Sequence, residues 1–205
     1  MSNHPTRRST ALFFVCSGFL VGIFLLLVIR FVNDRPPEDI HYHANFAVYV
    51  NGQREMFADP LLYEEIASCE AEGAHTTRGR VHLHEQINDV VHVEDAAVTW
   101  GHFFQSIGWN IGDRYLDTVS SLLVENNAQQ LHFILNGKPV SSIAGTIIGD
   151  RDRLLVSYGD LSEDQLQQQY ETVASTAQHY DETKDPAACS GEHETGVWDR
   201  IRRLF

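Results

Sequence analysis

The chain has 205 residues, a length that suits one moderate domain with appendages rather than two full domains. Its formal net charge is −13. The acidic residues are concentrated after an apolar N-terminal run, so we expect the large domain to repel nucleic acid, and no nucleic-acid partner is predicted. The sequence holds no nucleophile-elbow, P-loop or dinucleotide-binding motif, so whether the protein is an enzyme stays open.

The first predicted element is a transmembrane helix over residues 11–32, ALFFVCSGFLVGIFLLLVIRFV. At 1.5 Å per residue this run can cross a hydrocarbon core of about 30 Å. Arg7 and Arg8 precede it, so the positive-inside rule predicts a cytoplasmic tail at residues 1–10 and an extracytoplasmic domain after the span. A cleaved signal peptide is the alternative, but the run is longer than an ordinary h-region and no A-x-A-like site follows it.

Residues 33–39 form a polar linker stiffened by two prolines, and a strand of alternating character follows. Its apolar face carries Tyr42, Ala44, Phe46, Val48 and Val50, and its polar face carries His41, His43, Asn45 and Tyr49. The Asn-Gly pair at 51–52 predicts a hairpin turn, with the return strand over 53–57.

The middle of the chain predicts a short amphipathic helix over about 60–69, a loop, and a second hairpin with strands at 80–84 and 90–95. Thr99 is a plausible N-cap for a helix that ends near Ile107, and Gly108 would close it. Strands are expected over 130–140, around an Asn-Gly turn, and over 152–159. The expected core includes Trp100, Phe103, Phe104, Phe133, Leu135, Leu155 and Val156.

Residues 161–205 form an acidic tail in which Ser162 caps a predicted helix to about Ala177. The last residues, VWDRIRRLF, have a basic amphipathic pattern. Docking of this end on its own domain is favoured over binding to a membrane surface.

Beyond the predicted span the cysteines are Cys69 and Cys189. They lack the C-x-x-C spacing of a thiol oxidoreductase, and in an oxidising compartment such a pair favours a structural disulfide. Two free thiols are the alternative. Cys16 lies inside the apolar run and is interpreted as an ordinary apolar cysteine.

Histidines gather on one face of the second hairpin. If Val81 and Leu83 pair with Val93 and Val91 to form the buried face, strand parity places His82, His84, His92 and Glu94 on the opposite face. The first strand adds His41 and His43 on its polar side. The candidate metal ligands are therefore His41, His43, His82, His84 and His92.

Neutral imidazoles suit zinc or copper, and three of them with an open fourth position are the usual form of a catalytic zinc site. Glu85 or Glu94 would be a further ligand, or a carboxylate that orients a ligand. Two other interpretations stay open: ordinary solvated or hydrogen-bonded histidines, and a pH sensor. The scattered histidines are interpreted as solvated or hydrogen-bonded side chains: His75, His102, His132, His179 and His193. Asp150 and Asp152 are expected to shape a Gly-Asp turn, with calcium binding as an alternative.

Two resemblances follow from these motifs. The stretch VTWGHFFQSIG, with FILNGKPV and DRLLVSYGD, resembles the helix and closing strands of small β-grasp (ubiquitin-like) domains, without the Gly-Gly end of a sulfur carrier. HYHANFAVYVNG with VHLHEQINDVVHVED and VTWGHFF resembles a family of single-pass membrane-anchored bacterial and archaeal proteins with H-x-H motifs, over about residues 40–160. The second resemblance implies no particular activity. Glu94 stands here in place of that family's last histidine.

The predicted fold class is α+β: an N-terminal transmembrane helix, a mostly antiparallel β-grasp-like domain at 40–160, and an appended C-terminal helix. The sequence is compatible with two candidate functions of different class. One is a membrane-tethered, extracytoplasmic copper- or zinc-binding domain. The other is a non-catalytic cell-envelope module that holds a protein partner on its sheet.

Overall fold

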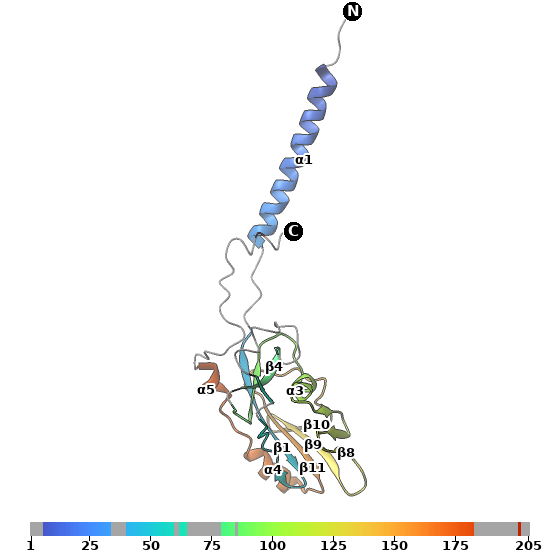
Figure 1. Cartoon of the computed structure of the whole chain (residues 1–205), viewed down its shortest axis with the longest axis vertical. Helices are drawn as coiled ribbons and strands as arrows, with labels where there is room; N and C mark the ends of the chain where they lie inside the picture. Colours follow the sequence, from blue (N-terminus) through green and yellow to red (C-terminus); the bar gives the residue numbers. More distant parts are fainter. Residues whose placement is uncertain are drawn as a thin grey trace, which may run out of the picture. The chain divides into compact units, whose positions relative to one another are not determined.

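The computed structural model describes residues 6–33, 40–59, 62–64, 79–84, 86–182 and 201. The chain divides into two units, residues 1–38 with 192–205, and residues 39–191. In the first unit, α1 (Thr6–Asn33) is one continuous helix (Figure 1). Its 22-residue stretch Leu12–Asn33 is long and apolar enough to cross a membrane, a test that an N-terminal signal sequence also passes. The apolar helix expected from the sequence is therefore present.

Eight strands of the described residues form one sheet in the second unit. Seven of them lie in the order β10-β9-β11-β1-β5-β4-β3, and β2 pairs with the end of β1. Their bounds are β1 Tyr42–Val50, β2 Gln53–Arg54, β3 Tyr63–Glu64, β4 Val81–His84, β5 Val90–Val93, β9 Gln130–Leu135, β10 Lys138–Val140 and β11 Arg153–Gly159. β1 is parallel to β11 and antiparallel to β5, so the sheet is mixed with mostly antiparallel pairs.

The two faces of β1 follow the alternation in its sequence. Ala44, Phe46 and Val48 are fully buried in the main apolar core, together with Val81, Val91 and Val93. Val81 is opposite Val93 and His82 is opposite His92, which is the pairing that the sequence predicted for the second hairpin. The opposite face carries His43 and Asn45, and both are buried rather than solvated. Both faces of the central strands are therefore covered.

The main core is closed by α3 (Trp100–Ser106), whose N-cap is Thr99 as predicted. The backbone N–H of Thr99 donates to Nδ1 of His102, and the backbone N–H of His102 donates to the Thr99 hydroxyl, so His102 completes a capping box. Gly108 adopts a positive φ of 76° just after the helix, where a side chain would be strained. Trp100, Phe103 and Phe104 are fully buried.

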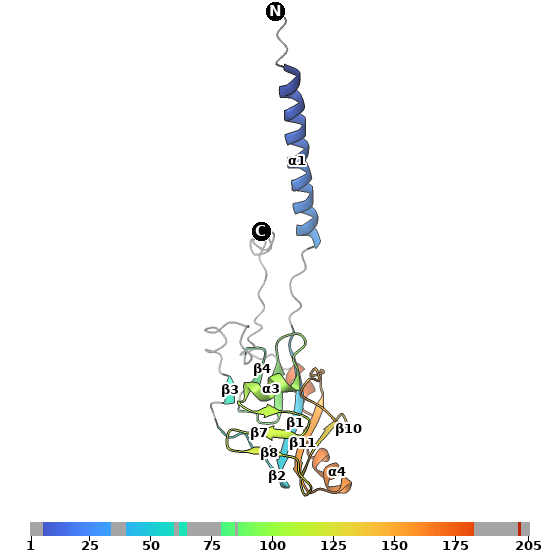
Figure 2. The ribbon, with the colours of Figure 1, turned by 90° about the vertical axis from the view of Figure 1, so that its right-hand side faces the viewer.

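A second, three-stranded sheet was not predicted from the sequence. It consists of β6 (Asn110–Ile111), β7 (Tyr115–Asp117) and β8 (Leu122–Val124), in that order. These strands have two or three residues each, too few for a period-2 pattern to stand out. Figures 1 and 2 show α3 and this small sheet on one side of the large sheet.

The other side of the large sheet is covered by α4 (Glu163–Glu171) and α5 (Ala177–Glu182), as Figure 1 shows. Tyr170 and Val173 of this region pack with Ala47, Tyr49 and Leu155 in a second apolar cluster. The predicted single helix to about Ala177 is wrong, because α4 stops at a C-cap on Thr172. The Arg153 guanidinium of β11 donates to the carbonyls of Val173 and Ala174, which satisfies backbone groups that a continuous helix would use itself.

Three smaller predictions also need correction. Tyr63 and Glu64, expected inside a helix at 60–69, form β3 instead, and the Tyr63 hydroxyl donates to the Phe57 carbonyl at 2.7 Å. The return strand expected over 53–57 stops at Arg54, because Phe57 adopts a positive φ of 42° and packs its ring 5.1 Å from that of Trp109. Leu135 is half-buried rather than part of the fully buried core, since it lies near the turn of the β9–β10 hairpin.

The predicted turns beside β10 and before β11 are confirmed. Asn136 and Gly137 take φ values of 52° and 77° in the turn between β9 and β10, as the Asn-Gly signal indicates. Asp152 accepts from the Gly149 backbone N–H and from the Asn136 side-chain amide, both at 2.7 Å, so it shapes the predicted turn. Cys69, Cys189, His75, His193 and Glu85 lie outside the described residues, and the Cys69–Cys189 disulfide stays a prediction.

Candidate metal centre

The candidate centre lies where three strands carry histidines in one row. His43 of β1 is opposite His92 of β5, and His92 is opposite His82 of β4. Neighbouring strands are about 4.8 Å apart, so side chains in such a row touch each other when they share a face. All three residues are 2–3% exposed, which is deeper than the intermediate burial typical of histidine.

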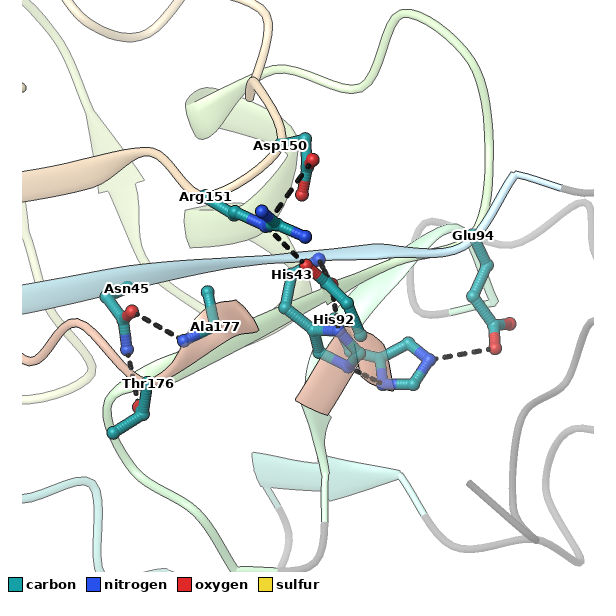
Figure 3. Close-up of polar contacts among 9 residues, drawn as sticks. His43, Asn45, His92, Glu94, Asp150, Arg151, Thr176 and Ala177 are labelled. Atoms are coloured by element: carbon teal, nitrogen blue, oxygen red, sulfur yellow. Dashed lines mark hydrogen bonds and ion pairs between the residues drawn. The ribbon is translucent and has the colours of Figure 1, made fainter. Parts of the chain in front are cut away.

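The His43 and His92 rings meet nitrogen to nitrogen. His43 Nε2 lies 3.2 Å from His92 Nδ1, and the ring centroids are 4.6 Å apart at an interplanar angle of 81° (Figure 3). His82 lies on the other side of His92, with its ring nearly parallel to the His92 ring and a centroid separation of 5.0 Å. The His92 ring is thus the middle member of the row.

Two carboxylates hold the outer nitrogens of these rings. His92 Nε2 lies 3.1 Å from Glu94 Oε1, and His43 Nδ1 lies 2.9 Å from Asp181 Oδ1. An ionised carboxylate only accepts hydrogen bonds, so a neutral ring at either position donates its single N–H to its carboxylate. Histidines bind metal in the neutral form, and in that form His43 Nε2 and His92 Nδ1, which face each other, are the two unprotonated nitrogens.

Asp181 is anchored by three donors from distant parts of the chain. It accepts from the His43 ring, from the His43 backbone N–H at 3.1 Å and from Arg151 Nε at 2.9 Å. Burial acts to raise the pKa of the Asp181 carboxyl, but the hydrogen bonds from His43 and Arg151 outweigh it and hold that pKa below its ordinary value. Asp181 therefore stays ionised beside the histidines.

The pKa of the Asp150 carboxyl, which also contacts Arg151, is shifted in the direction opposite to that of Asp181. Its pKa is raised by burial and by the negative charge of Asp181, and the Arg151 guanidinium at 3.7 Å only partly offsets these effects. Figure 3 shows Asp150 and Arg151 grouped on one side of His43, with Glu94 on the other side of His92. The region thus carries negative charge on both sides of the imidazoles.

His41, just before β1, completes the group. Its ring centroid lies 4.5 Å from that of His92 and 5.0 Å from that of His43. Its Nε2 is buried and has no hydrogen-bond partner among the residues that the structure describes. A buried polar atom without a partner costs about 1–3 kcal/mol, so such atoms are rare unless they have a role.

The helix that supplies Asp181 is positioned by Asn45, two residues after His43 on the same face of β1. The Asn45 side chain accepts from the Ala177 backbone N–H at 2.9 Å and donates to the Thr176 hydroxyl at 3.0 Å, as Figure 3 shows. Asn45 is 1% exposed. The start of α5 is therefore tied to the same strand that carries His43.

Two groups of side chains have their donor atoms within 4.8 Å of one another: His41 with His43 and His92, and His82 with His92 and Glu94. The sequence predicted ligands from two places, His82, His84 and His92 of the second hairpin and His41 and His43 of the first strand. The structure brings together members of both sets through His92. The backbone of His84 ends β4, but its side chain lies outside the described residues.

Asp181 was not identified from the sequence. It is 138 residues from His43, in a short helix of an acidic tail, and no local motif distinguishes it from its acidic neighbours. Glu94 was identified by strand parity with His92, and it does contact the His92 ring. Among the scattered histidines, His102 is hydrogen-bonded in the α3 cap, as that interpretation expected.

No protein-family model, curated protein or solved structure matches the chain. The resemblances to the membrane-anchored H-x-H family and to β-grasp domains therefore gain no support from these comparisons.

Proposed function

We propose that this protein is a membrane-tethered metal-binding protein whose domain binds a zinc or copper ion through His41, His43 and His92. The observation that carries the proposal is that His43 Nε2 lies 3.2 Å from His92 Nδ1 in a buried position, while a carboxylate contacts the other nitrogen of each ring. When both rings are neutral, two lone pairs face each other at this distance and repel unless a cation lies between or beside them. The carboxylates of Asp181 and Glu94 fix the rings in the orientation that produces this arrangement.

The distances support a metal ion in particular. Two ligands at 2.0–2.1 Å from a tetrahedral zinc ion are about 3.3 Å apart, close to the separation of His43 Nε2 and His92 Nδ1. A proton shared between those two rings is the competing explanation, and it would make the group a pH sensor. A shared proton leaves the buried His41 Nε2 without a partner among the described residues, whereas a metal ion uses all three imidazoles.

Asp181 and Glu94 fit the role of carboxylates that orient metal-bound histidines. A ligating histidine commonly donates its second N–H to a carboxylate, which fixes the tautomer and increases the basicity of the ligating nitrogen. Three neutral imidazoles suit zinc and copper and leave a fourth position for water or a substrate.

We further propose that residues 1–10 are cytoplasmic and that the domain lies outside the cell membrane, with residues 11–32 as an uncleaved span. Support comes from the apolar length of α1 and from Arg7 and Arg8 before it. Protease added to intact spheroplasts should degrade the domain. Full protection of the domain would contradict this topology.

A β-grasp assignment for residues 40–160 is also a proposal. It is supported by the parallel pairing of β1 with β11 at the centre of the sheet, by their antiparallel neighbours β5 and β9, and by α3 on one face.

The second candidate function, a cell-envelope interaction module, is favoured by one observation. Apolar side chains are exposed on and beside the small sheet, including Val119 at 80% and Leu122 at 62%. Exposed apolar patches mark interaction surfaces when they are large enough. This candidate requires no metal at the histidines.

Metal analysis of the tag-free full-length protein in detergent separates the two candidates. The first predicts stoichiometric zinc or copper after loading and gel filtration, with one ion per chain fewer in the double variant His41→Ala/His43→Ala. The matched control is His132→Ala, a half-buried histidine on β9, which β11 separates from β1 in the sheet. Absence of bound metal from folded wild-type protein after incubation with both ions would leave the interaction module as the better account.

A further inference from the structure

His92 offers its two ring nitrogens to two different groups of donors. Nδ1 faces His43 at 3.2 Å, on the side where His41 lies within reach, and Nε2 faces Glu94 Oε1 at 3.1 Å. Figure 3 shows these two contacts at different positions of the same ring. His82, His92 and Glu94 form their own group of donor atoms within 4.8 Å. The middle imidazole of the row therefore belongs to two potential metal sites at once.

The donor group of His82, His92 and Glu94 is buried as deeply as the first group. His82 is 2% exposed, and the Glu94 side chain is 3% exposed. The separation of His92 Nε2 from Glu94 Oε1 is again close to the distance of about 3.3 Å between two ligands of a tetrahedral ion. A buried carboxylate beside two imidazoles is a combination that divalent zinc or copper favours.

We propose that the domain holds two metal ions bridged by the His92 imidazole. His41, His43 and His92 Nδ1 bind the first ion, and His82, Glu94 and His92 Nε2 bind the second. This inference rests on the proposed function, because the first site is the one proposed above. On binding of the second ion, the Nε2–H bond of His92 breaks, its proton leaves to solvent, and the nitrogen lone pair forms a bond to the metal. No oxidation or reduction takes place.

The charges of the buried groups are compatible with this arrangement. Two divalent ions add four positive charges to that of Arg151, and the bridging imidazolate, Glu94, Asp181 and Asp150 supply four negative charges in the same region. Buried ions are stable only when opposite charge compensates them closely. With one ion bound, Glu94 orients His92 through a hydrogen bond. With two ions bound, Glu94 becomes a ligand.

The strand register gives the bridge its geometry. His92 is the direct cross-strand neighbour of both His43 and His82, so the three rings are held by backbone pairing on both sides. The nearly parallel stacking of His82 and His92, at 13°, keeps the two rings side by side rather than nitrogen to nitrogen. One donor atom of each of His82, His92 and Glu94 nevertheless lies within 4.8 Å of the others, so a single ion can reach all three.

The test is the metal stoichiometry of the tag-free full-length protein in detergent micelles. The protein is stripped, loaded with Cu²⁺ at saturation and passed through a gel-filtration column before the bound copper is measured. We expect two ions per chain in the wild type and in the control His132→Ala. Glu94→Gln and His82→Ala should each retain one ion, and that retained ion also reports that the fold and the first site are intact.

Electron paramagnetic resonance supplies a second readout that does not depend on counting. Two Cu²⁺ ions joined by one imidazolate couple magnetically, so the integrated signal of the wild type should fall well below that of two isolated ions. Glu94→Gln should restore the full signal of a single Cu²⁺ ion.

One ion per chain in the saturated wild type would overturn the bridge and leave the proposed function standing. Two uncoupled ions that persist in both variants would also overturn it, because the second ion would then lie elsewhere. No bound ion at all would refute the proposed function itself.

Discussion

Replacement of Asp181 by asparagine probes how the C-terminal helix α5 supports the metal centre. The Asp181 carboxylate accepts from His43 Nδ1 and from Arg151 Nε, each at 2.9 Å. Asparagine has nearly the same shape and keeps one acceptor oxygen, but it removes the negative charge that holds the His43 tautomer. The positions of His43 and Arg151 should therefore stay nearly unchanged, while the negative charge that stabilises the His43 tautomer is lost.

The expected effect on metal binding is large enough to measure. Loss of a carboxylate that orients a ligating histidine typically weakens metal affinity 10–100-fold, which corresponds to about 1.4–2.7 kcal/mol. The unliganded domain should also lose about 1–3 kcal/mol of stability, because hydrogen bonds to a charged group are replaced by weaker neutral ones. Both losses have the same cause and should appear together.

The assay is a competition titration of the full-length protein with a chromophoric chelator for zinc or copper. Glu182→Gln is the matched control, since it removes one negative charge from the same helix at an exposed position that does not contact the histidines. If Asp181→Asn binds metal as tightly as the wild type while His43→Ala does not bind, the carboxylate has no orienting role. An equal loss in Glu182→Gln would assign the effect to general charge instead.

Three further predictions concern the scaffold. Asn45→Ala should cost about 1–3 kcal/mol in denaturant unfolding, since it leaves the Ala177 backbone N–H without its acceptor, and it should weaken metal binding because α5 carries Asp181; unchanged affinity would disprove that link. Phe103→Ala should cost about 3–5 kcal/mol, because the fully buried ring packs 4.8 Å from that of Phe46; a loss below 1 kcal/mol would contradict the described core. Glu125 has a pKa lowered by the Leu131 backbone N–H and by Arg114, so its contribution to stability is complete above its ordinary pKa of 4.5 and is lost as pH falls toward the folded-state pKa. Unfolding of Glu125→Gln, measured from pH 6 to pH 3, should therefore show a weaker dependence on pH than the wild type.

The sequence alone determined those parts of the protein that depend on local periodicity and turn chemistry. The apolar run of α1, the alternation of β1, the cap of α3 at Thr99 and the Asn136–Gly137 turn were all predicted and are present. Strand parity also predicted that His92 and Glu94 would lie together. Each of these features depends on residues close in sequence, where a period of 2 or 3.6 and a few turn residues fix the backbone.

Tertiary structure decided the features that depend on distant partners. The break after Glu171 arises because Arg153 of β11 takes the carbonyls beyond the helix end, and Asn45 of β1 fixes where α5 begins. The depth of the histidine row follows from β1 and β5 becoming neighbours and from α5 covering that face, so residues that alternation marks as polar are buried. Asp181 reaches His43 across 138 residues, and no pattern within the acidic tail could have selected it, because its role comes from the packing of α5 on the sheet rather than from its own sequence neighbours.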